Sequence, residues 1–357
     1  MRIAVLGVGL IGGSVGLAAR TYLDDVEVVG FDPAAGVLSR ARALGAVDAV
    51  AGSVGEALAG GEACFLCAPV GELPALLEET LAAAPGDCVV SDVGSTKRAL
   101  ARATSDQRFV GGHPIAGAET SGVDQARADL FQGAAWYLTP SERSSGLLYE
   151  RLHRLIVSFG ARPVAIDPET HDRLLAAASH LPHVLANVLV SQAARRLAEE
   201  QEPLPRVGPS FRDATRVAGA DSRVWTDIYL TNNEAIAEEI DESISRLREV
   251  AAVLRARDAA AVERWNAEAR EDRRRLLEAD LVGGPVHELR LTVPNRPGIV
   301  AQVALALGKA DVNIVDMALA PAPDMRSGAM TLWIAGDDQS ARAFELVREL
   351  GFPVSEG

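Results

Sequence analysis

The sequence of 357 residues has little cysteine and no excess of positive charge. Its three cysteines are an odd and sparse set, which does not suit a disulfide-rich secreted protein and favours a reducing cytoplasm. Lysine and arginine together number 35 against 49 acidic residues, for a formal net charge of −14. Because no basic face compensates, we expect no nucleic-acid partner.

The sequence also offers little to a membrane or to a metal ion. We expect no membrane partner. The sequence shows no signal peptide, and no apolar run approaches about eighteen residues, the length of a membrane span. Cys64 and Cys67 form a C-x-x-C pair inside the apolar run 63–68, without a second pair of ligands nearby. We therefore predict buried strand cysteines and no metal site.

A glycine-rich turn stands at the start of the chain, between an apolar strand predicted over 2–6 and a helix. In its G-x-G-x-x-G spacing, one glycine permits the tight turn, one lets a pyrophosphate approach the backbone, and one lets the helix pack on the strand. The phosphates would bind the open N–H groups of the helix N-terminus. The cofactor-binding residues predicted here are Gly7, Gly9, Leu10, Ile11 and Gly12.

Asp32 ends the next apolar run, 26–31, about twenty positions after Gly12. A carboxylate there accepts hydrogen bonds from the adenosine ribose hydroxyls and repels a 2′-phosphate. No lysine or arginine follows directly, so the sequence favours NAD over NADP. The alternative is a doubly wound domain that binds no nucleotide.

Strands and helices alternate through 1–167, which predicts a Rossmann-type α/β domain with a doubly wound parallel sheet. Ligands bind beyond the carboxyl ends of such strands, and three loops fall there: 68–70, 92–97 and 111–119. The predicted strands are 2–6, 26–31, 63–67, 87–92, 108–111, 135–138 and 161–165.

Residues 168–282 are predicted to form an all-α domain. We expect helix over 171–200, interrupted at 180–183, and one long helix over 224–255 with a single apolar stripe. Helices of this length need a partner surface, so we predict a homodimer formed through this domain, with packing inside one chain as the alternative. The last part, 285–357, has the order strand, helix, two strands, helix and strand, which indicates a small ferredoxin-like α+β domain.

His113 lies in the 111–119 loop, at the mouth of the predicted cofactor cleft. A histidine there can take a hydroxyl proton while hydride leaves the same carbon. Ser95, in the preceding loop, would bridge this base, the substrate and the nicotinamide. The alternatives are a histidine that only bonds loop backbone and a serine that only caps a helix.

Two more polar clusters fall in the helical part. His180 and His183 flank Leu-Pro, and we favour a substrate-facing histidine over a metal pair, because no acidic ligand accompanies them. Asp213 and Arg216 lie close together, and arginine can grip a carboxylate with two hydrogen bonds; a salt bridge between domains is the alternative. These features indicate a nicotinamide-dependent dehydrogenase of an anionic hydroxy compound.

Four separated stretches resemble the motifs of the prephenate and arogenate dehydrogenases of tyrosine biosynthesis. In chain order they are DVGSTK at 92–97, GGHPIAG at 111–117, SHLPH at 179–183 and FRDATR at 211–216. The resemblance covers essentially the whole chain. The last part, with VPNRPG at 293–298 and DVNI at 311–314, is similar to an ACT domain, a small amino-acid-sensing module.

The resemblance implies NAD-dependent oxidative decarboxylation of prephenate to 4-hydroxyphenylpyruvate, or of arogenate to tyrosine. His113 would take the ring hydroxyl proton as hydride passes to the cofactor, and Ser95 would assist. The residues implied to hold or orient the substrate are His180, Asp213, Arg216 and Glu119. An aromatic amino-acid effector is expected at the ACT-like part, at Asn295, Gly298, Asn313 and Ile314.

Two other functions fit parts of the sequence. A β-hydroxyacid dehydrogenase shares the N-terminal fold and a helical second domain, but such enzymes usually rely on a lysine in the helical domain. No lysine occurs between 168 and 280, which argues against this alternative. A nicotinamide-binding regulator with a sensor domain would show no turnover.

Overall fold

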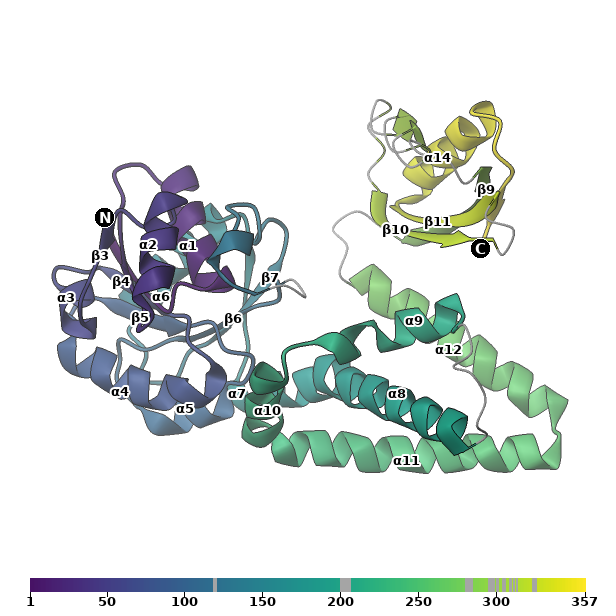
Figure 1. The fold of residues 1–357 in the computed structure, drawn as a ribbon, viewed down its shortest axis with the longest axis horizontal. Helices are drawn as coiled ribbons and strands as arrows, with labels where there is room; N and C mark the ends of the chain where they lie inside the picture. The colour runs from purple at the N-terminus through teal and green to yellow at the C-terminus, as the bar shows by residue number, and fades with distance from the viewer. Residues whose placement is uncertain are drawn as a thin grey trace. The chain divides into compact units, whose positions relative to one another are not determined.

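The computed structural model describes residues 1–117, 121–199, 207–279, 285–294 and 326–357, together with 299, 302, 303, 306, 307, 310, 312 and 314–322. The contacts within the chain fall into two compact units, Met1–Ile244 and Ser245–Gly357 (Figure 1).

A five-stranded parallel sheet lies at the centre of the first unit, in the order β3-β2-β1-β4-β5. Along β1, Ile3 and Val5 belong to the core on one face, and Ala4 and Leu6 belong to the core on the other. Because the strand is buried on both faces from residue 3 onward, positions 3–6 are all apolar. The strands are β1 (Arg2–Leu6), β2 (Glu27–Phe31), β3 (Ala49–Val50), β4 (Ala63–Leu66) and β5 (Val89–Asp92).

Helices cover both faces of this sheet, as the alternation of elements predicts. Side chains of α1, α2 and α6 enter the core of one face, and those of α3, α4 and α5 enter the core of the other. The strand order reverses between β1 and β4, which is where α/β sheets of this kind bind ligands. The helices are α1 (Leu10–Tyr22), α2 (Ala35–Ala43), α3 (Val54–Leu58), α4 (Leu73–Ala83), α5 (Arg98–Ala103) and α6 (Gly146–Ser158).

A second sheet contains β6 (Gly111–Pro114), β7 (Ala135–Thr139) and β8 (Arg162–Ala165). The expectation of one parallel sheet is wrong here, because β7 runs antiparallel to β6 and parallel to β8. The ring of Trp136 on β7 lies 6.2 Å from the ring of Phe65 on β4, so the two sheets share one core.

The helical part begins with α7 (Pro168–Leu175), the π-turn η3 (Ala176–His180) and α8 (Leu181–Glu199). The predicted interruption at 180–183 is wrong, since the helix continues through Pro182. In the π-turn, the N–H of Leu181 donates to the carbonyl of Ala176, five residues earlier. This change of register lets the helix pass a proline, which has no N–H to donate.

The long helix predicted over 224–255 is in fact two helices, α10 (Ser222–Thr231) and α11 (Asn233–Ala256). They are separated at Asn232, which is completely buried and donates from Nδ2 to the carbonyl of Asp172 at 2.8 Å. This hydrogen bond anchors the helix break on α7. Before α10 lie α9 (Pro209–Thr215) and the turn η4 (Arg216–Gly219).

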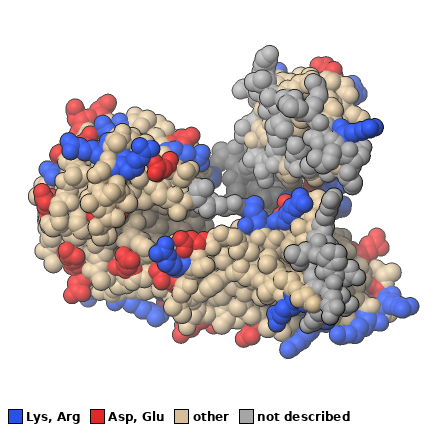
Figure 2. All heavy atoms as spheres, viewed as in Figure 1, with Lys and Arg blue, Asp and Glu red and all other residues tan. Residues whose placement is uncertain are grey.

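One helical run, Pro168–Arg196, is long and apolar enough by length and composition to cross a membrane. Our expectation concerns an unbroken apolar run, whereas this helix meets the criterion on its average hydropathy, with polar residues such as His180 and Asn187 inside it. Only 28 % of its most apolar window is buried in the chain. Leu185, Val188 and Leu189 are exposed on α8, and Figure 2 shows few charged side chains over this part of the surface.

The second unit holds the end of α11, then α12 (Ala259–Ala279) and a four-stranded antiparallel sheet with α14 (Asp337–Glu349) against it. Its order, β10-β11-β9-β12, puts the first and third strands in the centre, as in a ferredoxin-like sandwich. Ile314 begins β10 opposite Ile334. Asn295, Gly298 and Asn313 lie outside the described residues. The strands are β9 (Val286–Pro294), β10 (Ile314–Pro321), β11 (Ser327–Ala335) and β12 (Val354–Glu356).

Candidate active site

The glycine-rich turn joins β1 to α1 at the carboxyl edge of the parallel sheet. Gly7 has a φ of +93°, and a Cβ there would lie 2.7 Å from the carbonyl oxygen of Cys67. A Cβ on Gly12 would overlap the carbonyl oxygen of Gly7. Gly9, by contrast, precedes α1, and a Cβ there would meet nothing within 4 Å. Space therefore lies open before the helix N-terminus, as a bound pyrophosphate requires.

Asp32 lies directly beyond β2 and is fixed against the glycine-rich turn. One carboxylate oxygen accepts the backbone N–H of Val8 at 3.0 Å, and the other accepts that of Ala34 at 2.9 Å. The side chain is only partly buried, so its oxygens retain capacity for further hydrogen bonds. This placement suits the ribose contact predicted for it.

Ser95 lies in the loop after β5, whereas His113 lies within β6 and not in the predicted loop 111–119, because the strand begins at Gly111. Asp92, at the end of β5, accepts the backbone N–H of Gly112 at 3.0 Å. Lys97 pairs with Asp92 and donates to the carbonyl of Gly112 at 2.8 Å, and both charged side chains are completely buried. The ion pair thus ties the loop that carries Ser95 to the strand that carries His113.

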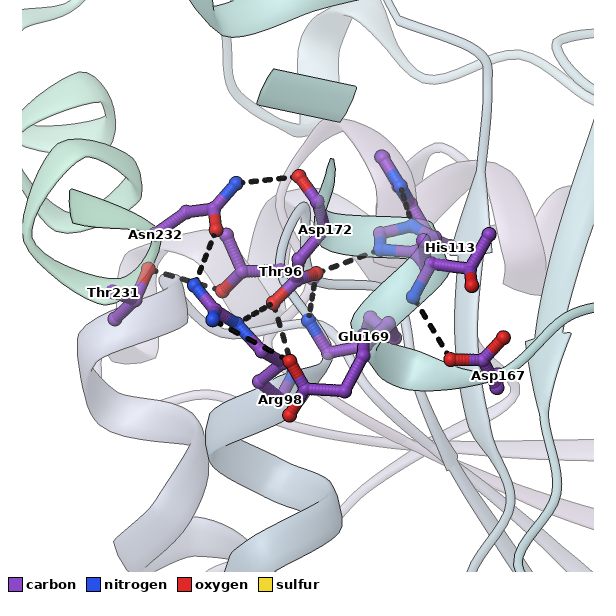
Figure 3. Close-up of polar contacts among 12 residues, drawn as sticks. Thr96, Arg98, His113, Asp167, Glu169, Asp172, Thr231 and Asn232 are labelled. Carbon is purple, nitrogen blue, oxygen red and sulfur yellow. Dashed lines mark hydrogen bonds and ion pairs between the residues drawn. The ribbon is translucent and has the colours of Figure 1, made fainter. Parts of the chain in front are cut away.

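His113, which is 9 % exposed, contacts a histidine that the sequence analysis did not single out. Its Nδ1 lies 3.0 Å from Nε2 of His171, and Nδ1 of His171 lies 2.8 Å from Oδ1 of Asp172 (Figure 3). Asp172 also accepts the backbone N–H groups of Lys97 at 2.8 Å and of Arg98 at 3.0 Å. Both His171 and Asp172 lie on α7 and are completely buried.

The electrostatic surroundings of His113 keep its ring neutral. Burial lowers the pKa of His113 well below its usual value of 6.5, and the neighbouring His171, Lys97 and His180 lower it further. A neutral imidazole has a lone pair with which to accept a proton. The site therefore has the chemistry of a general base.

Helix α10 is tied to the loops of this sheet edge. The hydroxyl of Thr96 donates to that of Thr231 at 3.0 Å, and Arg98 donates to the side-chain oxygen of Asn232 at 2.9 Å (Figure 3). The backbone N–H of Gly71 donates to Asp227 at 3.1 Å. These bonds hold the helical part against the loops that follow β4 and β5.

His180 is 1 % exposed, and its Nδ1 lies 3.2 Å from Nδ2 of Asn232. Burial lowers its pKa to about 4, so this ring is neutral as well. His183 stacks on Trp225 with 3.5 Å between ring centroids and hydrogen-bonds Tyr229. A row of aromatic rings thus adjoins His180.

The remaining predicted substrate residues lie elsewhere. Asp213 is on α9 and Arg216 begins η4, and both are exposed, so the structure does not place them in the buried network of His113. Glu119 lies outside the described residues. Within the described part of the chain, no group of three or more histidine, cysteine or acidic side chains could hold a metal ion.

Comparisons with known proteins connect this geometry to a family. The protein-family model for the nucleotide-binding domain of prephenate dehydrogenase matches residues 15–165. The family model for the dimerization domain of prephenate dehydrogenase matches residues 167–268. The cyclohexadienyl dehydrogenase of Zymomonas mobilis is 33 % identical over 262 residues, covering 72 % of this chain and 89 % of that protein. The chain belongs to the prephenate dehydrogenase family.

Other members of the family resemble the chain over most of its length. The prephenate dehydrogenase of Bacillus subtilis is 29 % identical over 354 residues, covering 97 % of this chain and 95 % of that protein. The structure of A. aeolicus prephenate dehydrogenase with hydroxyphenyl propionate and NAD⁺ matches with a TM-score of 0.73 and 28 % identity, covering 77 % of this chain and 98 % of that one. The structure of Synechocystis arogenate dehydrogenase matches with a TM-score of 0.67 and 26 % identity, covering 76 % of this chain and 99 % of that one.

Proposed function

We propose that this chain is an NAD-dependent prephenate dehydrogenase, which converts prephenate to 4-hydroxyphenylpyruvate in tyrosine biosynthesis. The observation that carries the proposal is the buried, neutral His113, held by His171 at the sheet edge that also bears the glycine-rich turn. Membership of the family supports the activity, and the NAD⁺ complex of the A. aeolicus relative supports the cofactor.

The glycine-rich turn fits NAD, which supplies the hydride acceptor when it is bound. The space at Gly9 and the uncapped N-terminus of α1 suit the pyrophosphate, with Leu10 and Ile11 offering backbone N–H groups. Asp32 suits the ribose hydroxyls, and its charge disfavours NADP.

His113 would perform the proton transfer of the reaction. Its Nε2 accepts the proton of the substrate's ring hydroxyl while the carbon that bears this hydroxyl loses hydride to NAD⁺. The proton returns to the ring oxygen after CO₂ has left and the ring is aromatic. Ser95 would hydrogen-bond the same hydroxyl. Because the product is aromatic, the reaction is effectively irreversible.

Prephenate carries two carboxylates, and an arginine is the residue best suited to grip one of them. Lys97 and Arg98, the cations beside the buried network, already pair with Asp92 and Asp172. Arg216, which ends the FRDATR stretch at 211–216 and is exposed at the start of η4, is our candidate for this role. The substrate-binding residues that we propose are His180, Asp213, Arg216 and Glu119.

We further propose a homodimer formed through residues 168–282. Its support is the family's dimerization domain and the exposed apolar side chains of α8, such as Val188 and Leu189. Residues 1–167 would bind the nucleotide. A cytoplasmic location would suit the three free cysteines.

We propose that residues 285–357 form an ACT domain that binds an aromatic amino acid. The support is the strand order of the second unit, which matches a ferredoxin-like sandwich with its own buried core. Feedback by the end product would then be separate from catalysis.

A parallel assay of prephenate and arogenate, each with NAD⁺ and NADP⁺, tests the proposed function. We expect NADH, CO₂ and 4-hydroxyphenylpyruvate from prephenate with NAD⁺. Turnover of arogenate alone would make the chain an arogenate dehydrogenase, the alternative that the Synechocystis relative supports. Turnover of neither compound would contradict the enzyme assignment and favour an NAD-binding regulator.

A further inference from the structure

Three buried side chains form a continuous line that ends at the proposed base. The line runs from Asp172 to His171 over 2.8 Å and from His171 to His113 over 3.0 Å. Asp172 and His171 are completely buried, and His113 is 9 % exposed. Water therefore has little access to either hydrogen bond.

The charge of Asp172 determines where the protons in this line reside. Burial opposes ionisation, but the hydrogen bonds from His171 and from the backbone N–H groups of Arg98 and Lys97 outweigh it and lower the pKa of Asp172. An ionised carboxylate only accepts hydrogen bonds, so Nδ1 of His171 carries a hydrogen.

The hydrogen bond between the two histidines determines which ring nitrogen of His113 carries a hydrogen. Because Nδ1 of His171 donates to Asp172, we infer the His171 tautomer whose Nε2 is an acceptor facing Nδ1 of His113. The neighbouring Nδ1 of His113 must then donate. Only Nε2 of His113 keeps a free lone pair.

We propose that His171 and Asp172 are positioning residues that hold His113 as the tautomer with a bare Nε2 and stabilise the imidazolium ion that forms when it takes a proton. This inference rests on the proposed role of His113 as base. The charged or titratable groups around His113 are His171, Lys97 and His180, and the charge of each lowers the pKa of His113. The hydrogen bond from Nδ1 of His113 to Nε2 of His171, which is itself held by Asp172, counteracts that effect when His113 takes a proton.

Two substitutions at one position separate this role from a structural one. H171N keeps a donor near Asp172 but removes the acceptor from His113, whereas the longer H171Q can place its amide oxygen where Nε2 stood. We expect H171N to lower kcat about 100-fold, with KM and NAD⁺ affinity unchanged. H171Q should recover about tenfold of that loss. His153 on α6 lies outside the network, so H153Q is the matched control.

The pH profile gives a readout that a packing defect would not move. Without an acceptor for its Nδ1–H, the imidazolium form of His113 is less stable, so the acid limb of kcat/KM in H171N should move to lower pH. Equal kcat in H171N and the wild type, or equal losses in H171N and H171Q with an unshifted profile, would overturn the proposal.

A direct measurement of the tautomer keeps this test independent of turnover. With ¹⁵N-labelled histidine, the ring nitrogens of His113 in the wild type should report a protonated Nδ1 and a bare Nε2, and H171N should lose that preference. A protonated Nε2 in the wild type would overturn the proposal. Absence of turnover with both prephenate and arogenate would instead overturn the proposed function, and the tautomer would still decide the role of His171.

Discussion

Gly12 packs so closely on Gly7 that a Cβ added to Gly12 would overlap the carbonyl oxygen of Gly7. Gly9, between them, faces open space. We predict that Gly9→Ala folds normally but loses NAD⁺ affinity, because its methyl group occupies the approach of the pyrophosphate. Gly12→Ala should lower the free energy of unfolding, because the backbone carbonyl of Gly7 would have to shift to make room for the new methyl group.

Thermal unfolding and calorimetric titration with NAD⁺ check both glycine variants together. We expect a normal unfolding temperature in Gly9→Ala and a lowered one in Gly12→Ala. Unchanged NAD⁺ affinity in Gly9→Ala would show that the pyrophosphate does not approach the backbone at this point.

Lys97 and Asp92 form a completely buried ion pair beneath the proposed site. Lys97→Met leaves the Asp92 carboxylate buried without its cation, which should cost about 3–5 kcal/mol in the free energy of unfolding. Arg40 and Asp124 are an exposed pair, so Arg40→Gln should cost less than about 1 kcal/mol. Urea unfolding measures the free energy of unfolding of both variants. Similar losses of unfolding free energy in Lys97→Met and Arg40→Gln would show that burial does not set the strength of the Lys97 pair.

His180 should make the stability of the protein depend on pH. Burial lowers its pKa from 6.5 to about 4 in the folded state, so between these values the unfolded chain binds more protons. Its contribution is therefore complete above 6.5 and is lost as the pH falls towards 4. We predict that His180→Gln flattens the decline of unfolding free energy across this window, by up to roughly 3 kcal/mol. A slope identical to that of the wild type would mean that His180 titrates normally.

The second unit has its own buried core around Leu289, Met330 and Val347. We predict that removal of 285–357 leaves turnover of prephenate intact and abolishes inhibition by an aromatic amino acid. Steady-state assays with tyrosine and with phenylalanine check this. Inhibition that persists unchanged would place the effector in the active site instead.

Local sequence patterns were sufficient to predict most of the helices and strands and the glycine-rich turn. The strand at 2–6 lies as predicted, because unbroken apolar runs and glycine spacing are local signals. The break at Asn232 was not predicted, because the apolar period continues on both sides of it and only a buried contact with Asp172 explains it. The helix through Pro182 was missed because a π-turn leaves no mark in hydrophobic periodicity.

His171 shows why the candidate site could be predicted only in part. It lies 58 residues from His113, and no spacing rule connects the two. The available signal was weak: a histidine and an aspartate, side by side, near the start of a mostly apolar helical run. Ser95 and His113 were accessible to sequence reasoning because each lies in a glycine-containing stretch beside an apolar run, although His113 lies on β6 itself.

His113 is the proposed base beside the cofactor. The most direct test compares the wild type with His113→Asn, with NADH formation from prephenate and NAD⁺ affinity measured on the same preparations. We predict that turnover falls by about 10²-fold or more while NAD⁺ affinity stays the same. Turnover retained at the wild-type level would show that His113 is not the base.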